Sequence, residues 1–124
     1  MWLTQTDESR PAIVTDTGER LFELIGADEK LGSSKLQSLA LSVIPAGKHS
    51  AAHYHKASAE VLYILQGSGE LHVDENKYSV ETGNVILLEP NEVHSLYNKS
   101  DEYDLKLLAI TAPPWRASDA YAVD

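Results

Sequence analysis

Short apolar or alternating segments, separated by Gly, Pro, Asn and Asp, run through most of this chain. They are rich in Val, Ile, Leu and Tyr, which suit a pleated and half-buried strand. Strand signals recur at short intervals, and no long segment with the helical period separates them, so we predict an all-β antiparallel sandwich or barrel. The predicted strands are Arg20–Ile25, Gln37–Ile44, His53–His55, Glu60–Gln66, Gly69–Asp74, Lys77–Glu81, Val85–Leu88, His94–Asn98 and Leu105–Ala112.

Between these strands, residues 26–35 are small and polar, and we expect them to form an exposed loop. At Gly67-Ser68 we expect a two-residue hairpin turn, which would place Ile64 opposite Leu71. Glu60 would then share the inner face of its strand with Ile64. Tyr63 and His72 would face outward.

Composition limits the size and class of the protein. The chain has 124 residues and 43% hydrophobic content, which is enough for one folded domain, 1–124, with one core. It has no cysteine, which excludes disulfides and thiolate metal ligands.

Charge and targeting signals narrow the partners. The formal net charge of −9 argues against nucleic acid and against an anionic membrane surface. The first residues lack a charged and then apolar leader, and no apolar run approaches the ~20 residues of a membrane-spanning helix. We therefore expect a cytoplasmic protein.

Three histidines and one glutamate carry the strongest chemical signal. His53 and His55 are two residues apart, so on a strand they point to the same face. Glu60 leads the next predicted strand and His94 begins a later one, and both can reach that face. Neutral imidazoles and a carboxylate suit a divalent transition metal, so we predict a metal site at His53, His55, Glu60 and His94.

The alternative is that Glu60 is a solvated residue at a strand end and that the histidines are incidental. A carboxylate buried alone on an apolar face would be costly, and a bound cation removes that cost. Two further histidines, His49 and His72, are interpreted as a loop residue and an outward-facing residue without a role at the site.

The spacing of these residues resembles the first motif of the cupins. That motif runs Gly, five residues, His-x-His, three or four residues, Glu, six residues, Gly. Gly47, His53, His55, Glu60 and Gly67 match every fixed position.

The second cupin motif is matched less completely. Gly83, His94 and Asn98 fit it, whereas Glu89 stands where a Pro is expected and Asn91 takes a Gly position. Asn tolerates the left-handed backbone conformation that a Gly would adopt there. The distance from Gly83 to His94 is preserved, so the histidine should still reach the site. The motif core spans residues 47–98.

This resemblance to small single-domain cupins implies a jelly-roll barrel, the double-stranded β-helix, with a metal near one mouth. Similar cupins bind Fe, Mn, Ni, Co, Cu or Zn through three His and one Glu, which leaves about two open positions on an octahedral ion. The ligands do not identify the metal. The inner-face residues expected to line a small apolar pocket are Leu62, Ile64, Leu71, Val73 and Leu96.

Three functions stay open. The first is a metal-dependent enzyme on a small organic substrate, either dioxygenase-like or sugar-isomerase-like. The second is a module that binds a small ligand or metal without turnover, and the third is a cupin whose site has degenerated. The resemblance also implies a homodimer, for which Tyr54, Tyr63 and Arg20–Ile25 would suit the interface.

Overall fold

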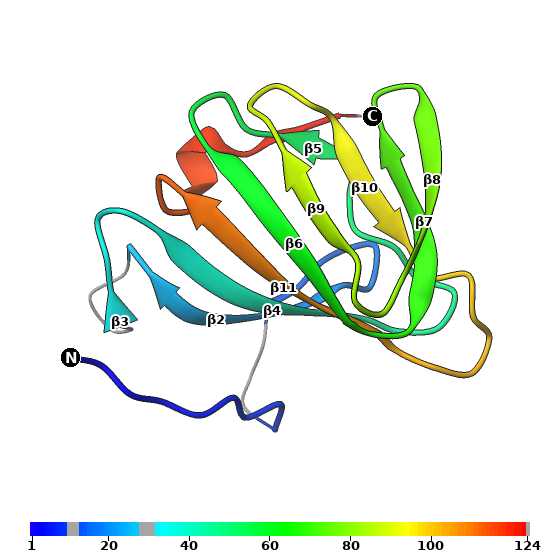
Figure 1. Cartoon of the computed structure of the whole chain (residues 1–124), viewed down its shortest axis with the longest axis horizontal. Coiled ribbons are helices and arrows are strands. Elements are labelled where there is room, and N and C mark those ends of the chain that lie inside the picture. The colour runs from blue at the N-terminus through cyan, green and yellow to red at the C-terminus, as the bar shows by residue number, and fades with distance from the viewer. Residues whose placement is uncertain (10–12, 28–31, 124) are drawn as a thin grey trace.

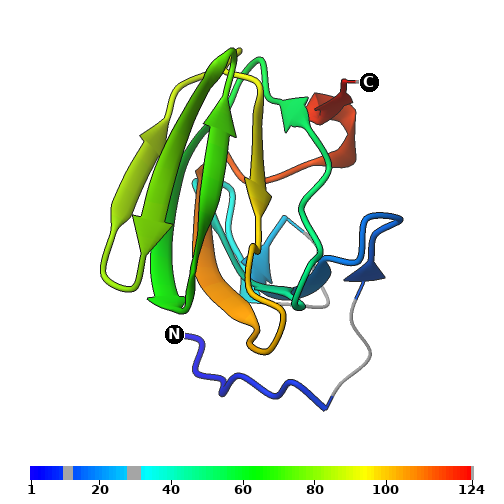
Figure 2. The ribbon, with the colours of Figure 1, turned by 90° about the vertical axis from the view of Figure 1, so that its right-hand side faces the viewer.

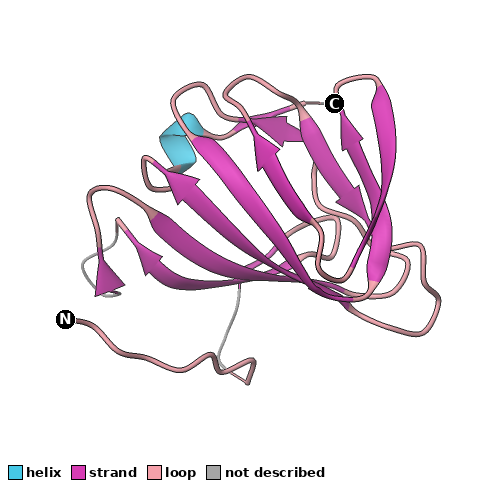
Figure 3. Ribbon diagram, in the orientation of Figure 1, coloured by secondary structure: helices cyan, strands magenta, loops and turns pink. Residues whose placement is uncertain are grey.

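The computed structural model describes residues 1–9, 13–27 and 32–123. In these ranges nearly all regular structure is strand, with one short 3₁₀ helix, η1 (Ala117–Asp119) (Figure 3). The predicted all-β class is therefore confirmed. No helix within the same ranges is long and apolar enough to cross a membrane.

Two sheets curve around a common interior (Figure 1). Nearly all neighbouring strands are antiparallel, the exception being the short parallel pair β2–β3. The first sheet contains, in spatial order, β1 (Ile13–Val14), β2 (Arg20–Gly26), β4 (Ser38–Ile44), β11 (Leu105–Ala112), β6 (Ala59–Gln66) and β9 (Val85–Leu88), with β3 (Gly32–Ser33) beside β2. The second contains β12 (Tyr121–Ala122), β5 (His53–Tyr54), β10 (His94–Tyr97), β7 (Ser68–Val73) and β8 (Asn76–Glu81).

Each strand expected from the hydrophobic pattern is present, with ends that differ by one residue at most. Three strands of two residues each, β1, β3 and β12, were not predicted, because two residues are too few to show a period. β3 lies inside the segment expected to be a loop, which is therefore a loop only in part. Residues 28–31 of that segment lie outside the described residues.

The predicted hairpin at Gly67-Ser68 is wrong. β6 pairs with β11 and β9, whereas β7 pairs with β10 and β8, so the chain crosses from one sheet to the other at Gly67. Ile64 accordingly lies opposite Leu107 and not opposite Leu71. Gly67 has a φ of +89°, and a Cβ there would lie 2.9 Å from the Asp104 carbonyl oxygen. A glycine is needed here because the chain changes sheets where the backbone of another segment lies close. The spacing of residues in the sequence does not distinguish such a crossing from a tight turn.

The predicted inner and outer faces are nevertheless correct, since Ile64 is fully buried and Tyr63 is exposed. Alternating burial along the strands places one continuous apolar core between the sheets. A smaller cluster of Phe22, Leu41 and Val43 forms on the opposite face of β2 and β4. The N-terminal segment passes outside the strands (Figure 2) and is tied to β11 by an ion pair between Glu8 and Lys106. The main core residues are Ile44, Leu62, Ile64, Leu71, Val80, Leu88, Leu96, Leu105 and Leu107.

We expect Leu105→Ala to lower the free energy of unfolding by about 2–5 kcal/mol, because it removes buried atoms and leaves a cavity. Leu105 is 0% exposed, whereas Leu36 is 80% exposed, so Leu36→Ala is a matched control that should change stability by less than about 0.5 kcal/mol. Urea unfolding curves measure both. Equal effects from the two variants would contradict the core assignment.

Candidate metal centre

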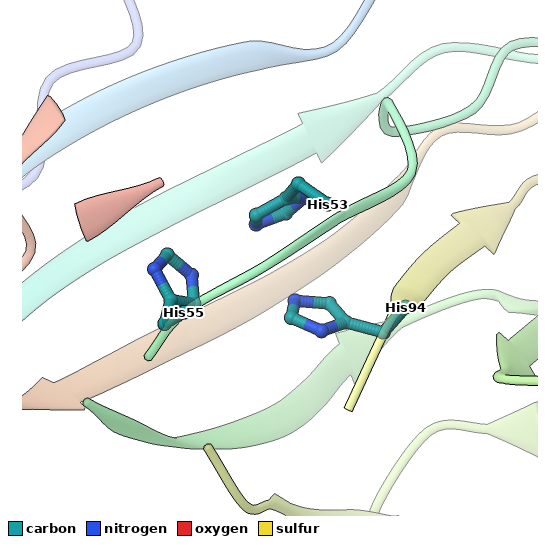
Figure 4. A group of neighbouring side chains, drawn as sticks. All are labelled: His53, His55 and His94. Atoms are coloured by element: carbon teal, nitrogen blue, oxygen red, sulfur yellow. The ribbon is translucent and has the colours of Figure 1, made fainter. Parts of the chain in front are cut away.

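Three histidines meet where β5 and β10 lie side by side. His53 pairs directly with His94 across the two strands, and His55 follows β5 immediately. Ring centroids are 4.4 Å apart for His53 and His94, 5.0 Å for His53 and His55, and 5.9 Å for His55 and His94. One nitrogen from each ring lies within 4.8 Å of the other two, and the rings converge on one space (Figure 4). These three residues could hold a metal ion.

Each imidazole is oriented by a backbone carbonyl behind it. The Nδ1 atoms lie 2.8 Å, 2.9 Å and 3.0 Å from carbonyl oxygens in His53, His55 and His94 respectively. A carbonyl only accepts hydrogen bonds, so Nδ1 carries the proton and the neutral ring keeps its lone pair on Nε2. This arrangement is the usual one for histidines that bind metals. The accepting carbonyls belong to Ala51, Asp119 and Glu92.

Two of the inward nitrogens form no hydrogen bond, although the carboxylate of Glu60 lies near both. Nε2 of His55 and Nε2 of His94 are buried and form no hydrogen bond with any described residue. A buried polar atom without a hydrogen bond is costly, and native structures contain few of them. A cation between the rings would satisfy both lone pairs. The residues therefore fit the metal that the sequence predicts.

Glu60, on β6, approaches the same space from the first sheet. Its Oε2 lies 3.3 Å from His55 Nε2, and its Oε1 lies 3.7 Å from His94 Nε2. Thr111 Oγ1 donates a 3.3 Å hydrogen bond to Oε2. Glu60 is only 8% exposed, so the alternative that it is a solvated strand-end residue is wrong. The four residues singled out by spacing are thus brought together.

Burial and charge set the ionisation of this group. Burial alone would raise the pKa of Glu60, but the neighbouring histidines outweigh it and lower the pKa. Burial likewise tends to lower the pKa of His55, but the adjacent Glu60 carboxylate raises it overall. Burial lowers the pKa of His94, and Glu60 offsets this only in part. Glu60 therefore stays ionised and adds a negative charge to the space between the rings.

A C-terminal segment that contains Asp119 supports this centre through hydrogen bonds. The carbonyl of Asp119, in η1, accepts the His55 hydrogen bond, while the Asp119 carboxylate accepts from the backbone amides of Lys56, Ala57 and Ser58 at 3.0–3.2 Å. Partial burial alone would raise the pKa of Asp119, but these amides hold it below its usual value. Tyr121, in β12, pairs with Tyr54 of the neighbouring strand β5. Sequence reasoning missed Asp119, which lies in a short C-terminal tail without a motif.

The centre opens into a cavity of about 600 Å³ between the sheets. His53, Glu60 and His94 form one part of its wall, and most of the remainder is apolar. Of the residues expected to line it, Leu62 and Leu96 do so. Ile64 and Leu71 belong to the core instead, and Val73 packs against that core. Two further acidic residues, Glu19 and Glu23, also line the cavity and were not predicted.

The two remaining histidines lie outside this group, as predicted. His49 and His72 each stack on Tyr97, at centroid distances of 4.5 Å and 4.3 Å. The interpretation of Asn91 is also confirmed, because its φ is +73° and its amide donates to the His55 carbonyl. A left-handed Asn therefore replaces the Gly of the second motif while keeping His94 in place.

Comparison with known proteins agrees with this fold and centre. The model of the cupin domain family matches residues 40–111, and the chain belongs to this family. The chain is similar to an uncharacterized protein of Methanocaldococcus jannaschii, with 33% identity over 116 residues that cover 94% of this chain and 90% of that protein.

Two further similarities involve Thermotoga maritima. The chain is 30% identical over 77 residues to its oxalate-binding protein, covering 62% of this chain and 63% of that protein. It also resembles the crystal structure of a predicted oxalate decarboxylase, with a TM-score of 0.66, 26% identity and coverage of 76% of this chain and 79% of that one. The predicted cupin jelly roll is thereby confirmed.

We expect Asp119→Asn to lower the urea midpoint, because a neutral amide oxygen accepts fewer and weaker hydrogen bonds than a carboxylate. Asp101→Asn, at an exposed position, is the matched control and should have little effect. Since the pKa of Asp119 is lowered on folding, its contribution is fully present above its usual value of 3.8 and is lost as pH falls through the lowered pKa. The two proteins should therefore converge in acid, and a difference that persists there would contradict this assignment.

Proposed function

We propose that this protein is a divalent-metal-dependent enzyme that acts on a small organic molecule, with His53, His55, Glu60 and His94 as the metal ligands. The observation that carries the proposal is the pair of buried Nε2 atoms, in His55 and His94, which lack hydrogen bonds and face the carboxylate of Glu60. Candidate ions are Fe, Mn, Ni, Co, Cu and Zn, since imidazole and carboxylate suit all of them.

The protein's own groups would position the metal ligands and balance the charge of the ion. The carbonyls behind the rings hold three neutral imidazoles in position, and Glu60 supplies one negative charge to balance the cation. The mostly apolar wall of the cavity surrounds one side of the centre. When bound, the metal would supply Lewis acidity, or redox chemistry for an ion such as Fe, to substrate oxygens at its open positions.

The cavity wall favours one substrate type over another. Leu21, Leu62 and Leu107 are among its many apolar lining residues. A sugar would leave several hydroxyl groups unpaired against such a wall, which is costly. A molecule with an apolar body and two adjacent oxygens would bury its body there and direct its oxygens to the metal. This supports the dioxygenase-like alternative over the sugar-isomerase-like one.

A second candidate function is ligand binding without turnover. The relative from Thermotoga maritima is named an oxalate-binding protein, which supports this alternative. The two functions differ in one measurable respect, because only an enzyme consumes its ligand. Oxygen consumption and product formation with dicarbonyl or phenolic compounds separate them.

We expect the wild-type protein, purified without a metal-binding tag, to hold about one transition-metal ion per chain. His94→Ala removes one proposed ligand and should lower the affinity for that ion by at least about tenfold. His72→Ala is the matched control, because His72 stacks on Tyr97 outside the centre, and it should retain the ion. Elemental mass spectrometry measures the metal content of all three proteins.

A wild-type protein that neither contains nor takes up a transition metal would contradict the proposal. Equal loss of metal from His94→Ala and His72→Ala would contradict the assigned ligands. A single redox-active ion would direct the substrate search to oxygen-consuming reactions, whereas Zn would direct it to Lewis-acid chemistry.

We also propose that the protein is a homodimer that uses the outer face of β6, β9 and β11. Exposed apolar side chains gather there, and such patches commonly mark interfaces. Tyr63 fits the predicted role, whereas Tyr54 stacks on Tyr121 of its own chain at 5.2 Å. The patch residues are Tyr63, Leu65, Val85, Leu87 and Ile110, which are 42%, 42%, 64%, 60% and 37% exposed.

Analytical ultracentrifugation measures the oligomeric state of the protein. We expect the wild-type protein to sediment as a dimer and Leu87→Lys to shift it toward monomer, because a charge would be buried at the interface. Leu36→Lys, at an exposed position outside the patch, is the control and should remain a dimer. A wild-type monomer at all concentrations would contradict the proposal.

A further inference from the structure

The carboxylate of Glu19 enters the cavity from the side of β2 and β4. Glu19 immediately precedes β2, where Arg20 pairs with Val43 of β4. The histidines, in contrast, come from the end of β5 and from β10 in the second sheet. Glu19 nevertheless lines the same cavity as His53 and Glu60. A ligand in this cavity would therefore lie near both Glu19 and the metal centre.

The surroundings of Glu19 leave part of the carboxyl group available. Ser42 Oγ, in a residue only 2% exposed, donates a 2.6 Å hydrogen bond to Glu19 Oε2. No described residue donates a hydrogen bond to Oε1, and none of the described cations forms an ion pair with this carboxylate. Burial raises the pKa of Glu19, and the Ser42 hydrogen bond offsets that rise in part.

Burial of this group has no evident structural benefit. A carboxyl group in an apolar wall, held by one serine and lacking a cation, costs free energy that an apolar residue would avoid. Perturbed acidic groups in a cavity are common at ligand-contacting positions. Ser42 holds Oε2, so Oε1 is the oxygen of this cavity-lining residue that is left for a ligand.

The charge of the cavity wall also restricts what can bind. Among the described lining residues, Glu19, Glu23 and Glu60 are acidic, whereas Arg116 is the basic residue. A metal ion at the centre would be balanced in part by Glu60. The remaining carboxylates would repel a compact dianion such as oxalate, which also lacks an apolar body to fill the cavity.

We propose that Glu19 contacts the ligand directly, so that the cavity selects an apolar molecule with two adjacent oxygens directed to the metal centre, one of them a hydroxyl group that also contacts Glu19. This inference rests on the proposed metal-dependent function. As a carboxylate Glu19 accepts a hydrogen bond from the ligand hydroxyl, and as a carboxylic acid it donates one to the ligand oxygen. Small dianions are disfavoured in either case by the apolar wall.

The test uses the full chain loaded with Co²⁺, whose visible absorption reports ligand binding, and two probes, 4-methylcatechol and oxalate. We expect wild type to bind 4-methylcatechol more tightly than oxalate. Glu19→Gln should retain Co²⁺ but bind 4-methylcatechol about tenfold more weakly. The ratio of its affinity for 4-methylcatechol to its affinity for oxalate should therefore be smaller than in wild type. Glu75→Gln, at an exposed turn, is the matched control and should behave as wild type.

Glu19→Asp provides a second variant that keeps the charge but withdraws it by one methylene. It should also weaken 4-methylcatechol binding, even if Glu19→Gln does not fold. Normal Co²⁺ uptake with wild-type affinities in the Glu19 variants would overturn this inference alone, as would tighter binding of oxalate than of 4-methylcatechol by wild type. Failure of wild type to bind Co²⁺ would overturn the proposed function and this inference together.

Discussion

Three hydrogen bonds from imidazole Nδ1 atoms to backbone carbonyls determine the chemistry of the centre. They place the proton on the outer nitrogen of His53, His55 and His94 and leave the lone pairs of Nε2 directed inward. Because the acceptors are main-chain atoms, the orientation of the rings depends on the positions of the segments that supply them. The fold is therefore needed at this site to hold backbone carbonyls as much as to hold side chains.

The two-sheet architecture supplies that support. β5 and β10 lie in one sheet and bring His53 and His94 into register, while β6 in the other sheet delivers Glu60. The segment around Asp119 lies against the loop after β5. The His55 ring and the backbone amides of Lys56 and Ser58 all form hydrogen bonds with Asp119. An apolar cavity between the sheets gives the centre a low-polarity neighbour, in which a charged pair interacts more strongly than in water.

Much of this could be predicted from the sequence, because period and motif spacing are local properties. Alternation identified the long strands, and spacing identified His53, His55, Glu60 and His94 as neighbours. The corner at Gly67 was missed because a strand that changes sheets has the same pattern as a hairpin. Glu19 and Asp119 were missed because their roles depend on distant contacts, with Ser42 and with the loop at residues 56–58. Such contacts leave no period and no motif.

The most direct measurement of the central claim is X-ray absorption spectroscopy of the protein loaded with one equivalent of Co²⁺. The account predicts about three imidazole nitrogens in the coordination shell, recognised by multiple scattering from the rings, together with carboxylate and water oxygens. A shell of oxygen atoms without imidazole scattering would contradict it, because the ion would then be held away from the three converging histidines.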